Sequence, residues 1–224
     1  MNILLSGCSR GIGLQILQVL LNSDKVETVF ALSSNINRLP KHSSIVAVEV
    51  DFMTDLWMDK VIEYVNDKEI HGLINNAGYL YNGKTGAIPQ YEINKMLTIN
   101  YSAPLQLIQG LLDNLKRGKA HIVNIGSMGG VSGSSKFPGL SVYSSTKAAL
   151  ANLSECWAEE LKEYGIASNC LALGAVNTEM LHEAFPGYVA PTSAIQIAKA
   201  IVEFTLSFDK VMNGKIIPLS VSTP

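Results

Sequence analysis

A tyrosine and a lysine stand four residues apart in the segment YSSTK, residues 143 to 147. On a helix this spacing makes the phenol of Tyr143 and the ammonium of Lys147 neighbours on one face. A free tyrosine has a pKa near 10, so it exchanges protons slowly at pH 7. A nearby positive charge stabilises tyrosinate and eases proton transfer. The pair could serve as a proton donor with its electrostatic partner, but the spacing alone fits an ordinary exposed helical turn equally well.

The first apolar strand runs into a glycine-rich loop, SGCSRGIG at residues 6 to 13, and an amphipathic helix follows at once. Gly7 permits a tight turn, Gly11 lets backbone approach a pyrophosphate, and Gly13 allows helix and strand to pack closely. The helix N-terminus then offers unpaired N–H groups to phosphates. A loop that merely turns the chain is the alternative, but the strand-loop-helix context favours dinucleotide binding.

Further short motifs follow this loop in a fixed order: NNAG at residues 75 to 78, Asn100 in LTIN, Ser127 in NIGS, then Tyr143 and Lys147. Each fragment alone is weakly informative. Taken together and in this order, over nearly the whole chain, they resemble the short-chain dehydrogenase/reductase family. That family uses a nicotinamide cofactor to interconvert carbonyl compounds and alcohols.

The resemblance implies a role for each of four catalytic residues. Tyr143 is the general acid/base, and Lys147 lowers its pKa together with the charge of oxidised nicotinamide and binds the nicotinamide ribose. Ser127 hydrogen-bonds the substrate carbonyl, and Asn100 holds a water that links Lys147 to solvent. Taken singly, these residues also fit a helix-surface lysine, a strand-end serine and a helix asparagine.

The resemblance also implies a set of cofactor contacts spread along the chain. The segment LGAVNTEM, 173 to 180, matches the family's carboxamide-binding segment, although Leu173 replaces the usual proline. Asp51 occupies the adenine-binding position. The predicted cofactor-binding residues are Gly7, Ser9, Arg10, Gly11, Ile12, Gly13, Ser33, Ser34, Asp51, Phe52, Asn75, Asn76, Ala77, Gly78, Tyr143, Lys147, Val176 and Thr178.

The end of the second strand indicates which nicotinamide cofactor is used. An acid there would bind the 2′-hydroxyl of NAD and repel the phosphate of NADP. The sequence has Ser33 and Ser34 instead, and Arg10 and Arg38 offer positive charge nearby. NADP(H) is therefore favoured over NAD(H), with Arg10 as the main partner of the extra phosphate.

Apolar runs of strand length alternate with helical patterns along the chain. Strands apolar on both faces and separated by helices predict a parallel sheet with helices on both sides. We therefore expect one Rossmann-type α/β/α domain, residues 1 to 224, with a seven-stranded parallel sheet and a substrate loop at about 177 to 195. The expected strands are 2–5, 28–32, 44–50, 72–78, 121–127, 166–173 and 215–220, and the expected helices are 12–22, 55–66, 89–116, 142–164 and 192–207.

Composition narrows the partners and the location. The net charge of −2 without a basic run argues against nucleic acid, and no apolar stretch reaches the roughly 20 residues that span a bilayer. The three widely spaced cysteines are expected to be reduced thiols. The N-terminus lacks the pattern of a secretory signal. Both features predict a cytoplasmic location. His71, His121 and His182 read as strand-flanking or loop residues, and no metal site is predicted.

These features predict an oxidoreductase acting on a small-molecule carbonyl or alcohol. The residues at 182 to 191, HEAFPGYVAP, favour a small or medium apolar substrate. In relatives the helices matching 89–116 and 142–164 pair across a two-fold axis, so the resemblance implies a homodimer or homotetramer. A cofactor-binding sensor with incidental catalysis is the first alternative, and an epimerase or dehydratase is the second.

Overall fold

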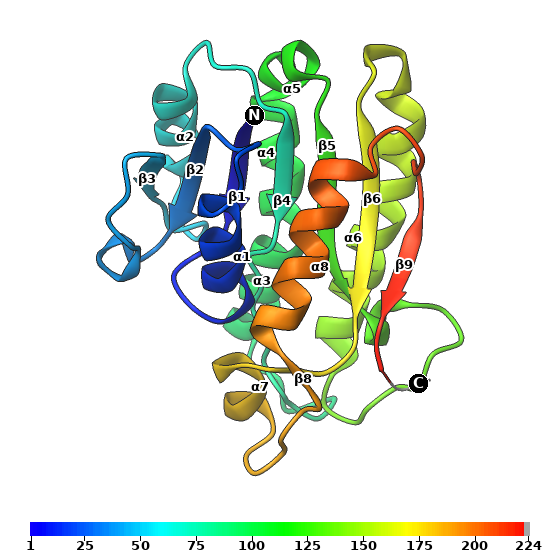
Figure 1. The fold of residues 1–224 in the computed structure, drawn as a ribbon. Helices are drawn as coiled ribbons and strands as arrows, with labels where there is room; N and C mark the ends of the chain where they lie inside the picture. The colour runs from blue at the N-terminus through cyan, green and yellow to red at the C-terminus, as the bar shows by residue number, and fades with distance from the viewer. Residues whose placement is uncertain (222–224) are drawn as a thin grey trace.

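The computed structural model describes residues 1 to 221, which form a parallel sheet with helices on both faces (Figure 1). The strand order is β3-β2-β1-β4-β5-β6-β9, and every neighbouring pair is parallel. The strands are β1 (Asn2–Ser6), β2 (Thr28–Ser33), β3 (Ile45–Glu49), β4 (Gly72–Asn75), β5 (His121–Ser127), β6 (Ala167–Leu173) and β9 (Ile216–Leu219). The predicted seven-stranded α/β/α architecture is confirmed.

Two groups of helices cover the two faces of the sheet (Figure 1). Helices α1 (Gly11–Leu21) and α8 (Ala194–Ser207) lie on one face. The other face carries α2 (Trp57–Val65), α3 (Gln90–Leu97), α4 (Ala103–Gly110), α5 (Leu112–Gly118) and α6 (Ser141–Glu160). The short helix α7 (Glu179–Ala184) lies beyond the carboxyl end of the sheet, next to the two-stranded pair β7 (Val176–Asn177) and β8 (Thr192–Ser193).

The core is divided by the sheet into two layers. Ile3 and Leu5 of β1 pack in the layer of α1 and α8, whereas Leu4 between them packs in the opposite layer. Successive strand residues point to opposite faces. Because helices cover both faces, all of these positions are apolar, which explains the uninterrupted apolar runs in the sequence.

The expected helix 89–116 is in fact three helices. Helix α3 passes through a π-helical segment (Thr98–Ser102) into α4, and α5 follows. Pro104, at the start of α4, has no N–H and cannot bond the carbonyl of Asn100 four residues earlier. The helix widens at this point, which is a recognised way of accommodating such a residue.

Most other predicted boundaries lie within about two residues of the observed ones, with a few exceptions. The fourth strand ends at Asn75 rather than residue 78, because the backbone of Asn76 turns to bond Ile74 and Ser6. The helix expected to reach 164 ends at Glu160, before a short 3₁₀ turn. The expected substrate loop contains the helix α7, on which His182 lies. No helix of the described residues is long and apolar enough to cross a membrane.

Candidate active site

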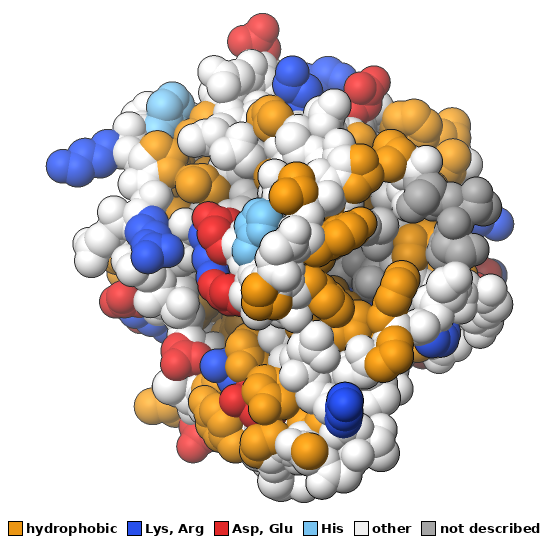
Figure 2. All heavy atoms as spheres, turned by 90° about the horizontal axis from the view of Figure 1, so that it is seen from below, with side chains coloured by type: hydrophobic (Ala, Val, Ile, Leu, Met, Phe, Trp, Pro, Cys, Tyr) orange, Lys and Arg blue, Asp and Glu red, His pale blue; other side chains and the backbone are white. Residues whose placement is uncertain are grey.

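Parallel pairing brings the predicted motifs to one edge of the sheet. β1 pairs with both β2 and β4, so the loops after β1 and β4 leave the sheet side by side where the chain order reverses. Such a point is where open α/β sheets form their ligand crevice. Figure 2 looks onto this end of the molecule, where charged side chains gather on one side and hydrophobic side chains surround a hollow.

Ser127, Tyr143 and Lys147 come together from two elements. Ser127 ends β5, and the other two lie in the first turns of α6. The Ser127 hydroxyl lies close enough to the phenol of Tyr143 to lower its pKa. Ser127 Oγ also accepts a 3.2 Å bond from the Gly129 N–H, so its own O–H is available to donate. The serine hydroxyl and the tyrosine phenol therefore face the same point.

Lys147 lies beneath this pair and is 3% exposed. Its Nζ donates a 2.7 Å hydrogen bond to the Ile125 carbonyl and lies 6.0 Å from the centre of the Tyr143 ring. Burial lowers the pKa of Lys147 from 10.5 to about 8, opposed by the nearby thiol of Cys170. The lysine is therefore still mostly protonated at pH 7, although the fold makes that charge costly.

Burial and a neighbouring hydroxyl act in opposite directions on the pKa of Tyr143. Burial raises the pKa of Tyr143 above its ordinary value of 10, and the neighbouring Ser127 hydroxyl lowers it only in part. Lys147 alone does not reverse this, because its Nζ is directed to the Ile125 carbonyl. The chain thus holds Tyr143 as a neutral phenol, which is the form that donates a proton.

Asn100 is fully buried in the π-helical segment, and its side-chain amide makes three hydrogen bonds. Its Oδ1 accepts from the Tyr79 N–H, and its Nδ2 donates to the Tyr79 carbonyl and to Thr146 Oγ1, at 2.8, 2.8 and 3.0 Å. A Cβ added to Gly78 would lie 3.5 Å from Lys147 Nζ and 3.6 Å from Asn100 Oδ1. Asn100 Oδ1 and Lys147 Nζ therefore both face Gly78. The sequence analysis missed the part of Tyr79 and Thr146, which adjoin the two motifs and hold the Asn100 side chain.

The glycine loop and the NNAG segment pack directly on each other. Gly7 and Gly11 have positive φ values of +71° and +54°, which glycine adopts without strain. A Cβ on Gly13 would lie 2.0 Å from the Gly7 carbonyl oxygen, and one on Gly7 would lie 2.7 Å from Ala77 Cα. Asn76 Nδ2 donates 3.0 Å bonds to the Ser6 and Gly7 carbonyls. Gly13 is thus needed for the loop itself to close, as well as for helix packing.

Several predicted cofactor-binding residues already contact neighbouring residues of the chain. Ser33 is buried and its Oγ accepts from the Asn35 N–H, whereas Ser34 is exposed. Asp51 is exposed and accepts from the Met53 N–H. Phe52 meets Trp57 edge to face with ring centres 4.7 Å apart.

The remaining predicted cofactor-binding residues differ in burial and in whether they lie in the core or beside the crevice. Asn75 is buried and its Nδ2 donates to Asn124 Oδ1 at 2.7 Å, inside the layer of α6. Ile12 packs on the core, and Ser9 and Ala77 are half-buried beside the crevice. Thr178 caps α7 by accepting from the Leu181 N–H, after buried Val176.

Helix α7 ties two sides of the crevice together. Arg10 of the glycine loop forms an ion pair with Glu183 at 2.6 Å, and Asn82, after β4, donates a 3.0 Å bond to the Ala184 carbonyl. Neither partner on α7 carried a signal in the sequence, because both contacts join segments more than 100 residues apart. Among the described residues, no group of three or more His, Cys, Asp and Glu could hold a metal ion.

Comparisons with known proteins identify the family of the chain. The family model described as short chain dehydrogenase matches residues 1–188. The chain is 30% identical over 185 residues to an L-xylulose reductase of Caenorhabditis elegans, covering 80% of this chain and 72% of that one. It is 35% identical over 145 residues to a fatty acyl-CoA reductase of Mycobacterium tuberculosis, covering 61% of this chain and 48% of that one.

A solved structure has the same fold. A short chain dehydrogenase family protein from Francisella tularensis superposes with a TM-score of 0.87 at 24% identity, covering 98% of this chain and 96% of the other. The chain spans about half the length of the fatty acyl-CoA reductase.

Proposed function

We propose that this chain, which belongs to the short-chain dehydrogenase/reductase family, interconverts a small carbonyl compound and its alcohol with NADP(H). The observation that carries the proposal is the meeting of Ser127, Tyr143 and Lys147 at the crevice, where the serine hydroxyl acts on the phenol and a buried ammonium lies 6.0 Å from the phenol ring centre. As an oxidoreductase of this family, the protein needs a hydride carrier and a proton carrier, and the tyrosine is the proton carrier.

The roles of the three side chains follow from their protonation. Ser127 donates its hydroxyl to the substrate oxygen and so orients the carbonyl. Tyr143, held as a neutral phenol, donates its proton to the same oxygen as negative charge develops there. The ammonium of Lys147 favours the tyrosinate that remains. A bound nicotinamide cofactor supplies or accepts the hydride.

We also propose a proton route through Asn100. Its side chain already makes three hydrogen bonds to Tyr79 and Thr146, so we assign the water to the backbone carbonyl. Pro104 cannot donate to this carbonyl, which loses its regular helical partner. The route would return a proton from solvent to Lys147 and then to Tyr143.

The glycine loop fits a dinucleotide. Gly11 keeps its positive φ, and the first turn of α1 has no side-chain cap, so its N–H groups can meet a pyrophosphate. β2 ends in Ser33 and Ser34 without an acid, and Arg10 and Arg38 are the nearby cations. These features support NADP(H) over NAD(H).

The substrate end of the crevice is apolar. Phe137, Tyr188 and Val189 belong to the segments that border it and are 60%, 48% and 70% exposed. Such a rim suits a small or medium apolar carbonyl compound. The three cysteines are free thiols, which supports a cytoplasmic location.

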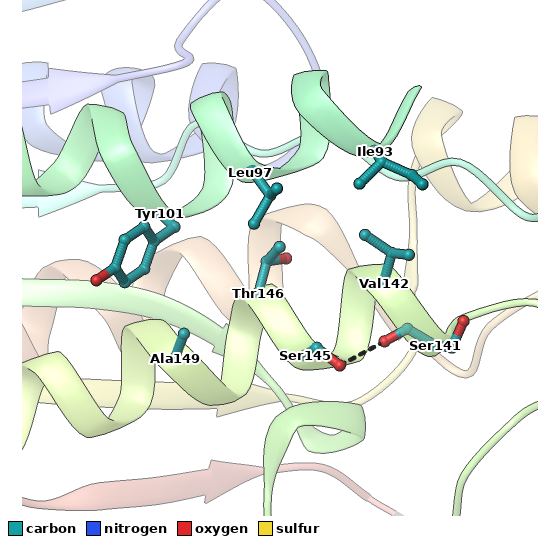
Figure 3. A pocket seen from close by; sticks show the side chains of 8 residues that line it. All are labelled: Ile93, Leu97, Tyr101, Ser141, Val142, Ser145, Thr146 and Ala149. Atoms are coloured by element: carbon teal, nitrogen blue, oxygen red, sulfur yellow. Dashed lines mark hydrogen bonds between the residues drawn. The ribbon is translucent and has the colours of Figure 1, made fainter. Parts of the chain in front are cut away.

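We further propose that the protein is a homodimer or homotetramer. A groove of about 340 Å³ runs between α3 and α6 (Figure 3). Ile93, Leu97 and Tyr101 point from one side toward Val142 and Ala149 on the other. Leu97 is 44% exposed, so this apolar face gains stability when a second copy covers it. Gel filtration with light scattering measures the state, and a monomer would contradict the proposal.

Tyr143→Phe tests the mechanism. NADPH absorbance is followed against a panel of aldehydes, ketones and quinones, and cofactor binding is measured by fluorescence titration. Turnover should fall by at least about 10²-fold, as expected for loss of a general acid, with NADPH still bound. Tyr164→Phe, on the exposed turn after α6, is the matched control and should keep full turnover. Turnover that survives Tyr143→Phe refutes the mechanism, and tight NADPH binding without turnover on any compound favours a sensor.

A further inference from the structure

The acidic face of α7 lies over the glycine loop. Glu179 and Glu183 are four residues apart and so share one face of the helix. A Cβ added to Gly11 would lie 3.5 Å from Glu179 Oε2, and Glu183 reaches Arg10. Two carboxylates therefore stand where a dinucleotide would bring its phosphates.

Arg10 is occupied by Glu183 in this arrangement. Its Nη1 donates to Oε1 at 2.6 Å and its Nη2 to Oε2 at 3.5 Å, so the guanidinium meets the carboxylate with two nitrogens. This is the planar, two-pronged geometry with which arginine also binds phosphate. One guanidinium edge cannot serve both partners at full strength.

A second contact keeps Glu183 in place. The next residue, Ala184, accepts a 3.0 Å hydrogen bond from Asn82 Nδ2, and the neighbouring Gly83 N–H donates to the Gly139 carbonyl at 3.0 Å. The C-terminal end of α7 is thus fixed to the loop after β4, which is itself fixed to the segment before α6. Glu183 therefore competes for Arg10 as a tethered group, at high effective concentration.

We propose that Glu183 is a specificity-determining residue, whose carboxylate competes with the 2′-phosphate of NADP(H) for Arg10. This rests on the proposed function, in which Arg10 meets that phosphate. NAD(H) has no phosphate at this position and leaves the ion pair intact. Glu183 therefore weakens NADP(H) binding selectively and sets how strongly the protein prefers it.

The size of the effect follows from exposure. The side chains of Arg10 and Glu183 are 41% and 62% exposed, so solvent screens the pair. Exposed ion pairs change an equilibrium constant by about 1.5- to five-fold. A phosphate carries a charge of about −1.5 to −2 and three acceptor oxygens, so it prevails over the carboxylate. Glu183 thus tunes the preference for NADP(H) without abolishing it.

Dissociation constants for NADPH and NADH, measured by fluorescence titration at fixed salt, test the proposal. In Glu183→Gln the dissociation constant for NADH divided by that for NADPH should be about 1.5- to five-fold higher than in the wild type. Glu179→Gln is the matched control on the same helix face. It faces Gly11 rather than Arg10, so it should change both constants by a similar factor and leave the ratio unaltered.

A double-mutant cycle completes the test. In an Arg10→Ala background, Glu183→Gln should no longer alter the ratio. The guanidinium for which the Glu183 carboxylate and the 2′-phosphate compete is then absent. An unchanged or lower ratio in Glu183→Gln, or the same rise with and without Arg10, overturns the inference while the proposed function stands. A wild-type protein that binds neither cofactor rejects the proposed function itself, and the inference with it.

Discussion

Replacing Lys147 by methionine should stabilise the fold while removing activity. Burial lowers the pKa of Lys147 from 10.5 to about 8, and a change of this size corresponds to about 3 kcal/mol. At pH 7 the folded protein is less stable by this amount than it would be with an uncharged side chain, because the buried ammonium stays charged. Methionine fills the same space without charge, but forfeits the hydrogen bond to Ile125, worth about 1 kcal/mol. The net gain should be about 2 kcal/mol.

The pH dependence distinguishes this cause from simple repacking. The unfolded chain keeps the lysine protonated up to about pH 10.5, whereas the folded protein releases that proton near pH 8. Below pH 8 both states are protonated and the whole cost is present. Between these values the wild type gains stability as the pH rises. The advantage of Lys147→Met should therefore be largest at pH 7 and become small near pH 10.

Calorimetric melting without added cofactor measures this effect. For a chain of this length, about 2 kcal/mol raises the melting temperature by about 4 to 8 °C. Lys199→Met, at an exposed position on α8, is the control and should show no such pH dependence. A lower melting temperature for Lys147→Met at pH 7, or the same difference from wild type at pH 7 and pH 10, refutes the reasoning.

Three further substitutions or reagents give separate tests. Gly13→Ala places a methyl group 2.0 Å from the Gly7 carbonyl oxygen, so we expect cofactor affinity to fall by at least about 10-fold, measured by titration; unchanged affinity would contradict the tight loop. Iodoacetamide at pH 8 should label only Cys156 in the folded protein. Burial raises the thiol pKa of Cys8 to about 12 and that of Cys170 to about 11, so these two thiols should not react. Detection of a second label by mass spectrometry before unfolding would contradict this expectation. Ser193→Ala removes the capping box of α8 and should cost about 1 kcal/mol in urea unfolding; no loss would mean that the cap contributes little.

The order of strands and helices was readable in the sequence because each pattern is local. Apolar runs such as Ile3 to Leu5 are buried on both faces of the sheet, which is what an uninterrupted apolar run predicts. The break in the predicted helix 89–116 could not be read with the same ease. A single proline near Asn100 can kink, widen or end a helix, and neighbouring packing decides which.

The sequence by itself determined the chemistry available at the site, because residue types and their order along the strands fix which groups reach the carboxyl edge of a parallel sheet. Tyr143, Lys147 and Ser127 were predicted as catalytic residues because the order of the motifs along the chain resembles a known family; the spacing of Tyr143 and Lys147 alone fits an ordinary helical turn. Only the tertiary structure decided the pKa shifts of the site residues and which other side chains contact the site. The burial that keeps Tyr143 protonated depends on atoms brought from many segments. The ion pair of Arg10 with Glu183 joins residues 173 positions apart, a separation at which no local pattern in the chain carries information.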